Sequence, residues 1–372
     1  MLGGLIVIIG LLTILMVHEG GHLVGAKFFG MKATKYFLGF GPTLWSFQRG
    51  ETEYGIKAIP AGGYVRIIGM NPLEEVSPED EHRTYRRSPF HQKAIVVMAG
   101  VATHFVLAFV LIWLANVVVG EPDRDRPMLE ISRIVSQTSD GSPTAAMQAG
   151  LEPGDRIVAI DGSSIANWNE LTDILRSSPN QSIAMEVERD GQRLTLRATL
   201  TSMTDLDTGE EVGFLGVSPS VGRSRDNPVV GIGTAAVEVG EFTRQSTRGL
   251  WEFVTNFGNF IGALFGDDEV LDEVRPVSVI GATQFGAASQ RAGLNYTLEL
   301  LAYISIFIAL LNAVPLYPFD GGHFAVALYE KVTGRQPDVR KLLPVAAVVI
   351  FFIVVVGLLG IYFDIVRPID LG

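Results

Sequence analysis

Four long apolar runs constrain this chain more than any other feature of its sequence. A helix needs about 20 apolar residues to cross a bilayer, and each run approaches or exceeds that length. Charged residues make up only 19 % of the 372 residues, against the ~25 % typical of soluble domains. We therefore predict a polytopic α-helical membrane protein with four transmembrane helices. The runs are Leu2–Val17, which continues through polar positions to about Phe29, then Ala94–Val119, Leu298–Pro315 and Leu342–Phe363.

Composition excludes several classes of protein. The chain has no cysteine, which removes disulfides and cysteine-ligated metal sites. Its net charge of −11 argues against a nucleic-acid partner, because phosphate binding needs a basic face. The first apolar run has no lysine or arginine before it, so we expect a retained transmembrane helix rather than a cleaved signal peptide.

The lysines predict an orientation. All seven lie either between the first and second runs or between the third and fourth, and four spans place these two stretches on one side. The positive-inside rule makes that side cytoplasmic. Both termini and the segment 120–296 are then extracytoplasmic. The lysines are Lys27, Lys32, Lys35, Lys57, Lys93, Lys331 and Lys341.

The segments between the spans predict two further structures. Residues 53–59 and 64–68 alternate like strands and are joined by Pro60-Ala61-Gly62-Gly63, which indicates a membrane-associated β-hairpin or sheet. Residues 127–220 mix short strands with one helix, about Asn167–Arg176, as in an α+β domain. From Val237 to Leu264 the apolar spacing predicts amphipathic helices on the membrane. The expected division is 1–29 (first span), 30–92 (cytoplasmic-side β-region and loop), 93–119 (second span), 127–220 (α+β domain), 229–296 (interfacial helices), 297–322 (third span) and 341–364 (fourth span).

The first span ends in His18-Glu19-Gly20-Gly21-His22. Helical positions i and i+4 share a face, so both imidazoles can reach one cation, and the glutamate beside the first can take a proton from water. Charged groups cost ~2.5–3.5 kcal/mol at the bilayer centre, so ionisable groups in a span are usually functional. This motif predicts a zinc hydrolase.

A catalytic zinc normally has three protein ligands and keeps a fourth position for water. Asp320 is the natural third ligand, because it follows two helix-breaking prolines and precedes two glycines. Broken backbone at membrane depth is tolerated where it lines protein or a wet cavity. The remaining histidines are His82, His91, His104 and His323.

HEGGH together with Asn312-Ala313-Val314-Pro315-Leu316-Tyr317-Pro318-Phe319-Asp320-Gly321-Gly322 resembles the site-2 protease family of intramembrane metalloproteases. The resemblance is to its bacterial PDZ-containing branch, which acts in regulated intramembrane proteolysis. It implies that His18, His22 and Asp320 bind Zn²⁺, that Glu19 is the catalytic base, and that the chain lies in the bacterial cytoplasmic (inner) membrane with its active site toward the cytoplasm. Asn312, Gly39 and Gly41 match positions near bound substrate.

One position departs from the family pattern. The family usually carries Gly-Pro-x-x-Asn in the second span, where this chain has Gly100-Val101-Ala102-Thr103-His104. We favour the interpretation that His104 replaces an amide hydrogen bond. The alternative is that it contacts the metal, either as an inhibitory ligand or through another ligand.

Residues 127–220 resemble one PDZ domain of the rearranged bacterial type, through the runs 141–151 and 153–157. A PDZ groove captures extended peptides or C-terminal carboxylates, and the alternative is a plug that only filters access by size. The resemblance assigns the strand and the carboxylate-binding loop to Gly213, Phe214, Leu215, Gly216 and Val217.

The sequence therefore predicts an intramembrane zinc endopeptidase that cleaves single-span membrane proteins, such as anti-sigma factors or signal-peptide remnants, in the lipid bilayer. An unwound substrate needs hydrogen-bond partners in lipid, and the edge of the predicted sheet could supply them, with Tyr54, Ile56 and Ile67 along the two runs. The alternative is a catalytically silent membrane scaffold whose PDZ domain recruits partners.

Overall fold

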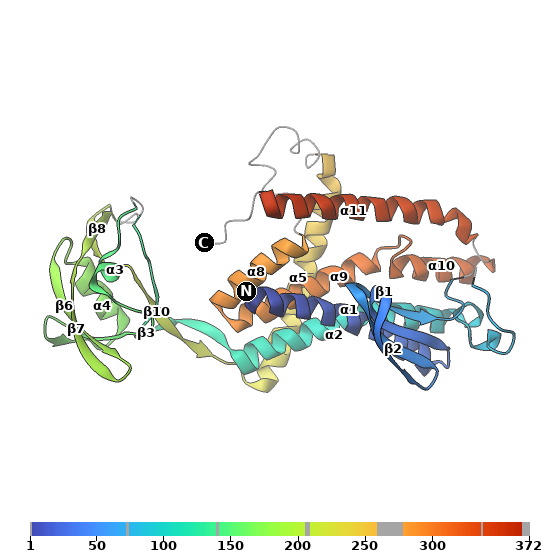
Figure 1. Ribbon diagram of the computed structural model, residues 1–372, viewed down its shortest axis with the longest axis horizontal. Helices are drawn as coiled ribbons and strands as arrows, with labels where there is room; N and C mark the ends of the chain where they lie inside the picture. Colours follow the sequence, from blue (N-terminus) through green and yellow to red (C-terminus); the bar gives the residue numbers. More distant parts are fainter. Residues whose placement is uncertain are drawn as a thin grey trace. The chain divides into compact units, whose positions relative to one another are not determined.

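The computed structural model describes residues 2–71, 74–138, 141–204, 209–258, 278–335 and 338–366. The chain divides into two compact units. Met1–Val119 and Asp226–Gly372 form the helical unit, and Gly120–Arg225 form the α+β unit (Figure 1).

Among the described residues, four helices of the helical unit are long and apolar enough to cross a membrane. Helix α2 contacts both α1 and α9. Glycine permits the close approach of α1 to α2, because a Cβ on Gly21 would lie 2.6 Å from the carbonyl oxygen of Ala99. Because of these four long apolar helices, the chain is a membrane protein. The four helices are α1 (Leu2–Phe28), α2 (Phe90–Leu114, continued by a π-helical turn, Ala115–Val119), α9 (Leu294–Ala313) and α11 (Leu343–Val366).

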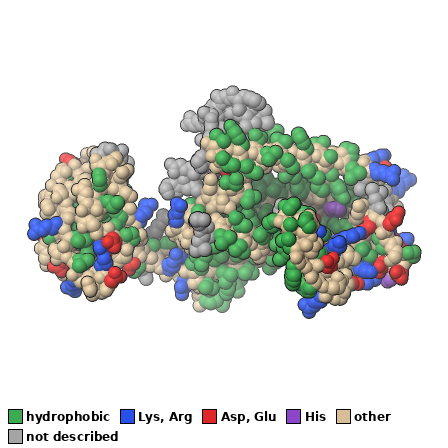
Figure 2. All heavy atoms as spheres, viewed as in Figure 1, with side chains coloured by type: hydrophobic (Ala, Val, Ile, Leu, Met, Phe, Trp, Pro, Cys, Tyr) green, Lys and Arg blue, Asp and Glu red, His purple; other side chains and the backbone are tan. Residues whose placement is uncertain are grey.

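Helix α11 is exposed along most of its length, and apolar side chains cover it in Figure 2. Near its C-terminal end, however, Asp364 is buried and caps α8 (Val279–Ala292). Its Oδ2 accepts hydrogen bonds from the backbone N–H of Ser278 (2.8 Å) and of Gly281 (3.0 Å). A carboxylate is favourable at a helix N-terminus. This cap explains how a charged residue is accommodated in an apolar span.

The region after α1 folds differently from the predicted hairpin. The strands are β1 (Ala33–Arg49) and β2 (Thr52–Ile67), and the tight turn lies at Gly50 and Glu51. The run 53–59 does not pair with 64–68, because Tyr36 of β1 lies opposite both Tyr54 and Val65. The prediction that the runs 53–59 and 64–68 form a hairpin with each other was wrong, because β1 lies between them. Gly63 instead serves close packing, since a Cβ there would lie 3.1 Å from Sδ of Met16 on α1.

The segments before the second span and after the third contain short helices that were not predicted from the sequence. Between β2 and α2 lie two short 3₁₀ turns, Glu81–Arg83 and Tyr85–Arg87. Asp320 was expected at the end of the third span, but it is the first residue of a further helix, α10 (Asp320–Thr333). Pro315 and Pro318 interrupt the helical backbone and allow the chain to start a new helix at Asp320.

The predicted amphipathic segment is one described helix, α5 (Pro228–Thr255), which begins within one residue of the expected boundary at 229 and nine residues before the apolar spacing starts at Val237. Asn227 caps it and proline occupies its first turn, a favourable helix start that the apolar spacing could not reveal. The helix contacts α2 and α9. The predicted positions Ile261 and Leu264 lie outside the described residues.

The α+β unit is built on a twisted sheet in the order β10-β3-β4-β6-β7, with β5 beside β4 and a separate pair, β8 and β9. The predicted helix appears as α4 (Trp168–Arg176), capped by Asn167, and a shorter helix, α3, spans Ala145–Ala149. A continuous apolar core joins sheet and helices. The strands are β3 (Glu121–Ile134), β4 (Arg156–Ile160), β5 (Ser163–Ser164), β6 (Ser182–Arg189), β7 (Gln192–Thr199), β8 (Thr201–Thr204), β9 (Glu211–Phe214) and β10 (Val217–Ser224).

Asp155 should make this unit sensitive to acid. Burial would raise the pKa of Asp155, but hydrogen bonds from Arg189 and from the backbone of Glu152 outweigh it and hold the pKa below its usual value. A depressed pKa contributes stability that is full above the ordinary carboxyl pKa of ~3.9 and is lost as the pH falls toward the folded value. Asp155→Asn should lower the unit's melting temperature by roughly 5 °C or more at pH 7.

The measurement is thermal unfolding of the protein at pH 7 and at pH 3, with the exposed Asp173→Asn as matched control. Asp155→Asn should melt well below the parent at pH 7, and the difference between the two should be smaller at pH 3. Equal melting of both variants at pH 7 would contradict this account.

Candidate metal centre

Three side chains from distant parts of the chain meet at one point. His18 and His22 come from α1, and Asp320 comes from the first turn of α10. The Nε2 atoms of the two histidines are 3.2 Å apart, and Asp320 Oδ2 lies 3.3 Å from Nε2 of His18 and 3.2 Å from Nε2 of His22. Among the described residues this is the one group of three histidine, aspartate or glutamate side chains close enough to share a metal ion.

The distances fit zinc. Three corners of a tetrahedron with zinc–ligand bonds of ~2.0–2.1 Å are separated by about 3.3–3.4 Å, which agrees with the three observed separations. Asp320 Oδ2 is buried and has no hydrogen-bond partner in the described structure. A buried carboxylate oxygen without a partner is costly, and a cation among the three atoms would satisfy it.

Local structure fixes each of these side chains. His22 Nδ1 lies 2.9 Å from the backbone oxygen of Val96, a contact that leaves Nε2 for the metal. Gly100 provides the room behind the imidazoles, since a Cβ there would collide with His22 and lie 2.9 Å from Cε1 of His18. Gly321 is similarly required, because a Cβ would collide with the carbonyl oxygen of Ala313.

Asp320 has the charge that a metal ligand needs. A carboxylate binds metals in its ionised form, and Asp320 Oδ2 lies within 3.3 Å of Nε2 of both imidazoles.

Glu19 lies on α1 between the two histidines and turns toward β2. Its Oε2 accepts a hydrogen bond of 2.8 Å from the backbone N–H of Val65. The carboxylate is thus held against the edge of the sheet, beside the candidate metal ligands. This is the position that a base acting on a water molecule at the metal would take.

A cavity of about 540 Å³ is lined by Val65, the residue that binds Glu19, and its neighbours. Residues 64–67 of β2 form one wall, and Tyr317, His323 and Leu343 lie across from them. The rings of Tyr317 and His323 are 4.7 Å apart, centroid to centroid. Figure 2 shows a hollow beneath α11 with a histidine visible at its edge. His323 was predicted only as a possible ligand and Tyr317 was not predicted at all, although both lie within three residues of Asp320.

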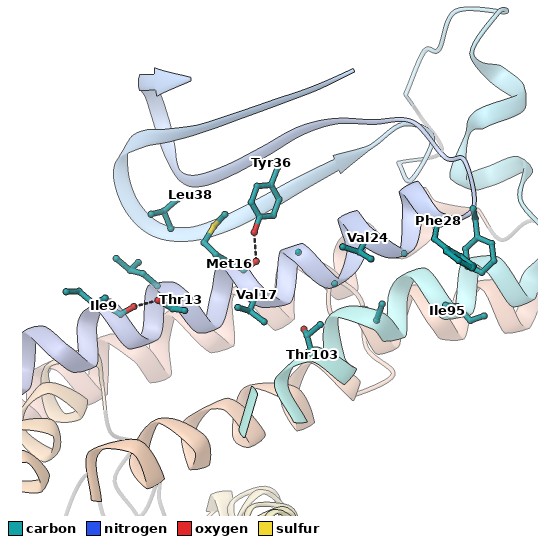
Figure 3. Close-up of a pocket in the computed structure, with 16 residues that line it drawn as sticks. Ile9, Thr13, Met16, Val17, Val24, Phe28, Tyr36, Leu38, Ile95 and Thr103 are labelled. Atoms are coloured by element: carbon teal, nitrogen blue, oxygen red, sulfur yellow. Dashed lines mark hydrogen bonds between the residues drawn. The ribbon is translucent and has the colours of Figure 1, made fainter. Parts of the chain in front are cut away.

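A second cavity, of about 940 Å³, is an apolar groove along α1. Figure 3 shows Val24 and Phe28 of α1 with Ile95 and Thr103 of α2 along it, and Tyr36 of β1 donating a hydrogen bond to the carbonyl oxygen of Met16. None of the three proposed metal ligands lines either cavity, but the smaller cavity is lined by Val65, whose N–H binds Glu19, and by Tyr317 and His323, which lie close to Asp320 in sequence.

The residues predicted to bind substrate lie in three different places: the end of α9, strand β1 and strand β2. Asn312 is the penultimate residue of α9, and Gly39 and Gly41 lie in β1 with positive φ. Tyr54 and Ile56 belong to the interior run of the sheet, opposite Tyr36 and Leu38. They cannot form a free edge, which corrects the expectation for them.

Ile67 lies in the run 64–68, which pairs with β1 on one side only. Its side chain, however, is buried in the core between α1, α2 and the sheet. Only its backbone could meet a substrate.

In the α+β unit, the predicted loop lies at the junction of β9 and β10. Gly213 packs against the C-terminal end of α4, where a Cβ would collide with the carbonyl oxygen of Leu175. Leu215 is buried, so its backbone but not its side chain is available. Gly216 has a φ of +90°, a conformation that favours glycine.

The family model described as Peptidase family M50 matches residues 6–356. The chain belongs to this family, the site-2 proteases. Membership confirms the prediction of a zinc metalloprotease, with zinc as the metal.

Relatives of this M50 peptidase match it over most of their length. Zinc metalloprotease Rip1 of Mycobacterium tuberculosis is 32 % identical, over 98 % of this chain and 97 % of the relative. A putative zinc metalloprotease of Nostoc sp. is 31 % identical, over 87 % of this chain and 85 % of the relative. A solved PDZ domain of an SdrC-like protein from Listeria monocytogenes is 20 % identical, covering 23 % of this chain and 84 % of that one, with a TM-score of 0.19.

Proposed function

We propose that this chain is an intramembrane endopeptidase whose zinc is held by His18, His22 and Asp320 and whose base is Glu19. The observation that carries the proposal is the depth of the site. Glu19 lies nine residues before the end of α1 at Phe28, which is about 14 Å along a helix rising 1.5 Å per residue. A bilayer core is ~30 Å thick, so the reacting peptide bond would lie inside it.

The side chains would share the work as follows. Zinc, when bound, supplies a Lewis acid that polarises the scissile carbonyl and acidifies water. Glu19 takes the proton of the attacking water through one carboxylate oxygen, while the N–H of Val65 holds the other. Glu19 then passes the proton to the leaving nitrogen, so that the base is regenerated. Asn312 is proposed to contact the substrate near the metal.

The edge of β2 is proposed to hold the substrate as an added strand. The Val65 N–H points to Glu19 and therefore away from β1, and alternate residues of a strand face the same edge. The N–H of Ile67 should thus face outward too, into the cavity lined by residues 64–67. Unwound substrate backbone would find its hydrogen-bond partners there.

Ile67→Pro tests this edge. Proline removes the outward N–H of Ile67, so cleavage should fall at least tenfold while zinc remains bound. Ile67→Ala is the matched control, because it loses the same buried side chain but keeps the N–H, and it should cleave substantially faster than Ile67→Pro. Equal rates for the two variants would refute strand addition at this edge.

The α+β unit is proposed to be a PDZ domain on the extracytoplasmic side, which binds a peptide or C-terminus or filters substrates by size. The proposed substrates are single-span proteins of the bacterial cytoplasmic membrane, with the metal site toward the cytoplasm. The seven lysines support this orientation.

One experiment separates this function from a silent scaffold. Purified protein in lipid vesicles is analysed for zinc and incubated with a single-span substrate. We expect about one zinc per chain and cleavage that chelation abolishes. Protein that folds, contains no zinc and cuts nothing would favour the scaffold instead.

A further inference from the structure

His104 lies against the proposed metal centre without belonging to it. It projects from α2, is 1 % exposed, and its ring centroid is 4.8 Å from that of His18. It is not part of the group of side chains close enough to share one ion. Its Nε2 atom is buried and has no hydrogen-bond partner in the described structure.

The hydrogen bonds of Ser305 fix the tautomer of this histidine. Ser305 is buried on α9, and its hydroxyl donates to the backbone oxygen of His104 at 3.1 Å. A serine hydroxyl has one proton to give. The 3.0 Å contact between Ser305 Oγ and His104 Nδ1 must then be a bond donated by Nδ1. It follows that Nε2 of neutral His104 carries a lone pair and acts as an acceptor.

His18 has the complementary need. A neutral histidine that offers Nε2 to a metal carries its proton on Nδ1, and that N–H almost always has an acceptor. His22 meets this rule through the carbonyl oxygen of Val96. The Nδ1 atom of His18 is buried and has no hydrogen-bond partner in the described structure.

The competing acceptor is already engaged. The backbone carbonyl of Gly100 is close enough to His18 to form a weak hydrogen bond with it, but it also accepts a 2.7 Å hydrogen bond from the hydroxyl of Thr103. As part of α2 it also accepts the helical N–H four residues later. A carbonyl oxygen has two lone pairs, so the bond to His18 is one of three that share them.

We propose that His104 is a positioning residue for the metal ligand His18. In the metal-bound protein, Nε2 of His104 accepts a hydrogen bond from the Nδ1–H of His18, a bond that the described structure does not contain because both atoms are unpartnered there, and Ser305 sets the tautomer that makes this possible. The link runs from α9 through α2 to α1 and orients the imidazole that receives the metal. This inference rests on the proposed ligand set.

The test measures metal binding rather than turnover. His104→Leu fills a similar space without an acceptor, so zinc should bind 10–100-fold more weakly, as measured by chelator competition. His104→Asn supplies an amide oxygen as acceptor and should restore affinity to within about threefold of the parent, if that link is the cause. Ser305→Ala removes the hydroxyl that fixes the tautomer of His104 and should weaken zinc binding by an intermediate factor.

Cobalt substitution provides a second readout. The visible absorption of Co²⁺ bound to the parent and to His104→Asn should agree, while His104→Leu should shift it, because the orientation of His18 changes. Thermal melting of the metal-free variants checks that each is folded. If His104→Leu does not fold, Ser305→Ala still decides the test.

His22→Ala separates this inference from the ligand assignment. If His22→Ala binds zinc like the parent, the ligand set itself is wrong. If His22→Ala loses zinc but folded His104→Leu or Ser305→Ala binds it as tightly as the parent, the positioning role of His104 is overturned.

Discussion

Glu19→Gln should reduce cleavage by 10²–10⁴-fold, the usual contribution of a general base, while zinc content stays near that of the parent. The amide has nearly the same shape as the carboxylate, and its oxygen can still accept the hydrogen bond from Val65 N–H that now holds Glu19. It cannot, however, take a proton from water. Because Glu19 is not one of the three grouped side chains, its loss leaves the metal in place.

The measurement is cleavage of a single-span substrate in vesicles, combined with zinc analysis of the same preparation. The exposed Glu79→Gln is the control and should behave like the parent. Turnover at the parental rate by Glu19→Gln would eliminate Glu19 as the base.

Asp320→Ala should abolish both zinc binding and cleavage. The substitution removes the one charged member of the proposed ligand set and leaves two imidazoles whose Nε2 atoms are 3.2 Å apart. Two ligands from one helix are fewer than the three that catalytic zinc sites use. His323→Ala is the matched control on the same helix, and it should retain zinc because His323 is not in the group.

Zinc analysis after purification without added metal distinguishes these variants. Zinc that stays with Asp320→Ala and leaves with His323→Ala would mean that the third ligand is His323.

The proposed metal ligands could be predicted from sequence because their signals are local. The spacing of His18 and His22 is set by one turn of helix, and the prolines and glycines around Asp320 mark a broken span whatever it packs against. That these two signals converge within 3.3 Å is a fact of tertiary packing. The resemblance to the protease family supplied it in advance.

The sheet was predicted less well because strand pairing is not local. The glycines at 62 and 63 look like a turn in sequence, yet Gly63 is required where β2 crosses α1. No spacing rule could show that Tyr36 would lie between Tyr54 and Val65. The cap that Asp364 forms on α8 was missed for the same reason, since its partners are more than 80 residues away.

Mapping the cleaved bond tests the central claim most directly. Products of a single-span substrate cut in lipid vesicles are identified by mass spectrometry, with Glu19→Gln as the inactive reference. The account predicts a cut within the substrate's membrane span or at its edge, in the half of the bilayer where α1 ends at Phe28. Glu19→Gln should make no such cut. Cleavage confined to the substrate's soluble segments, or the same intramembrane cut by Glu19→Gln, would contradict it.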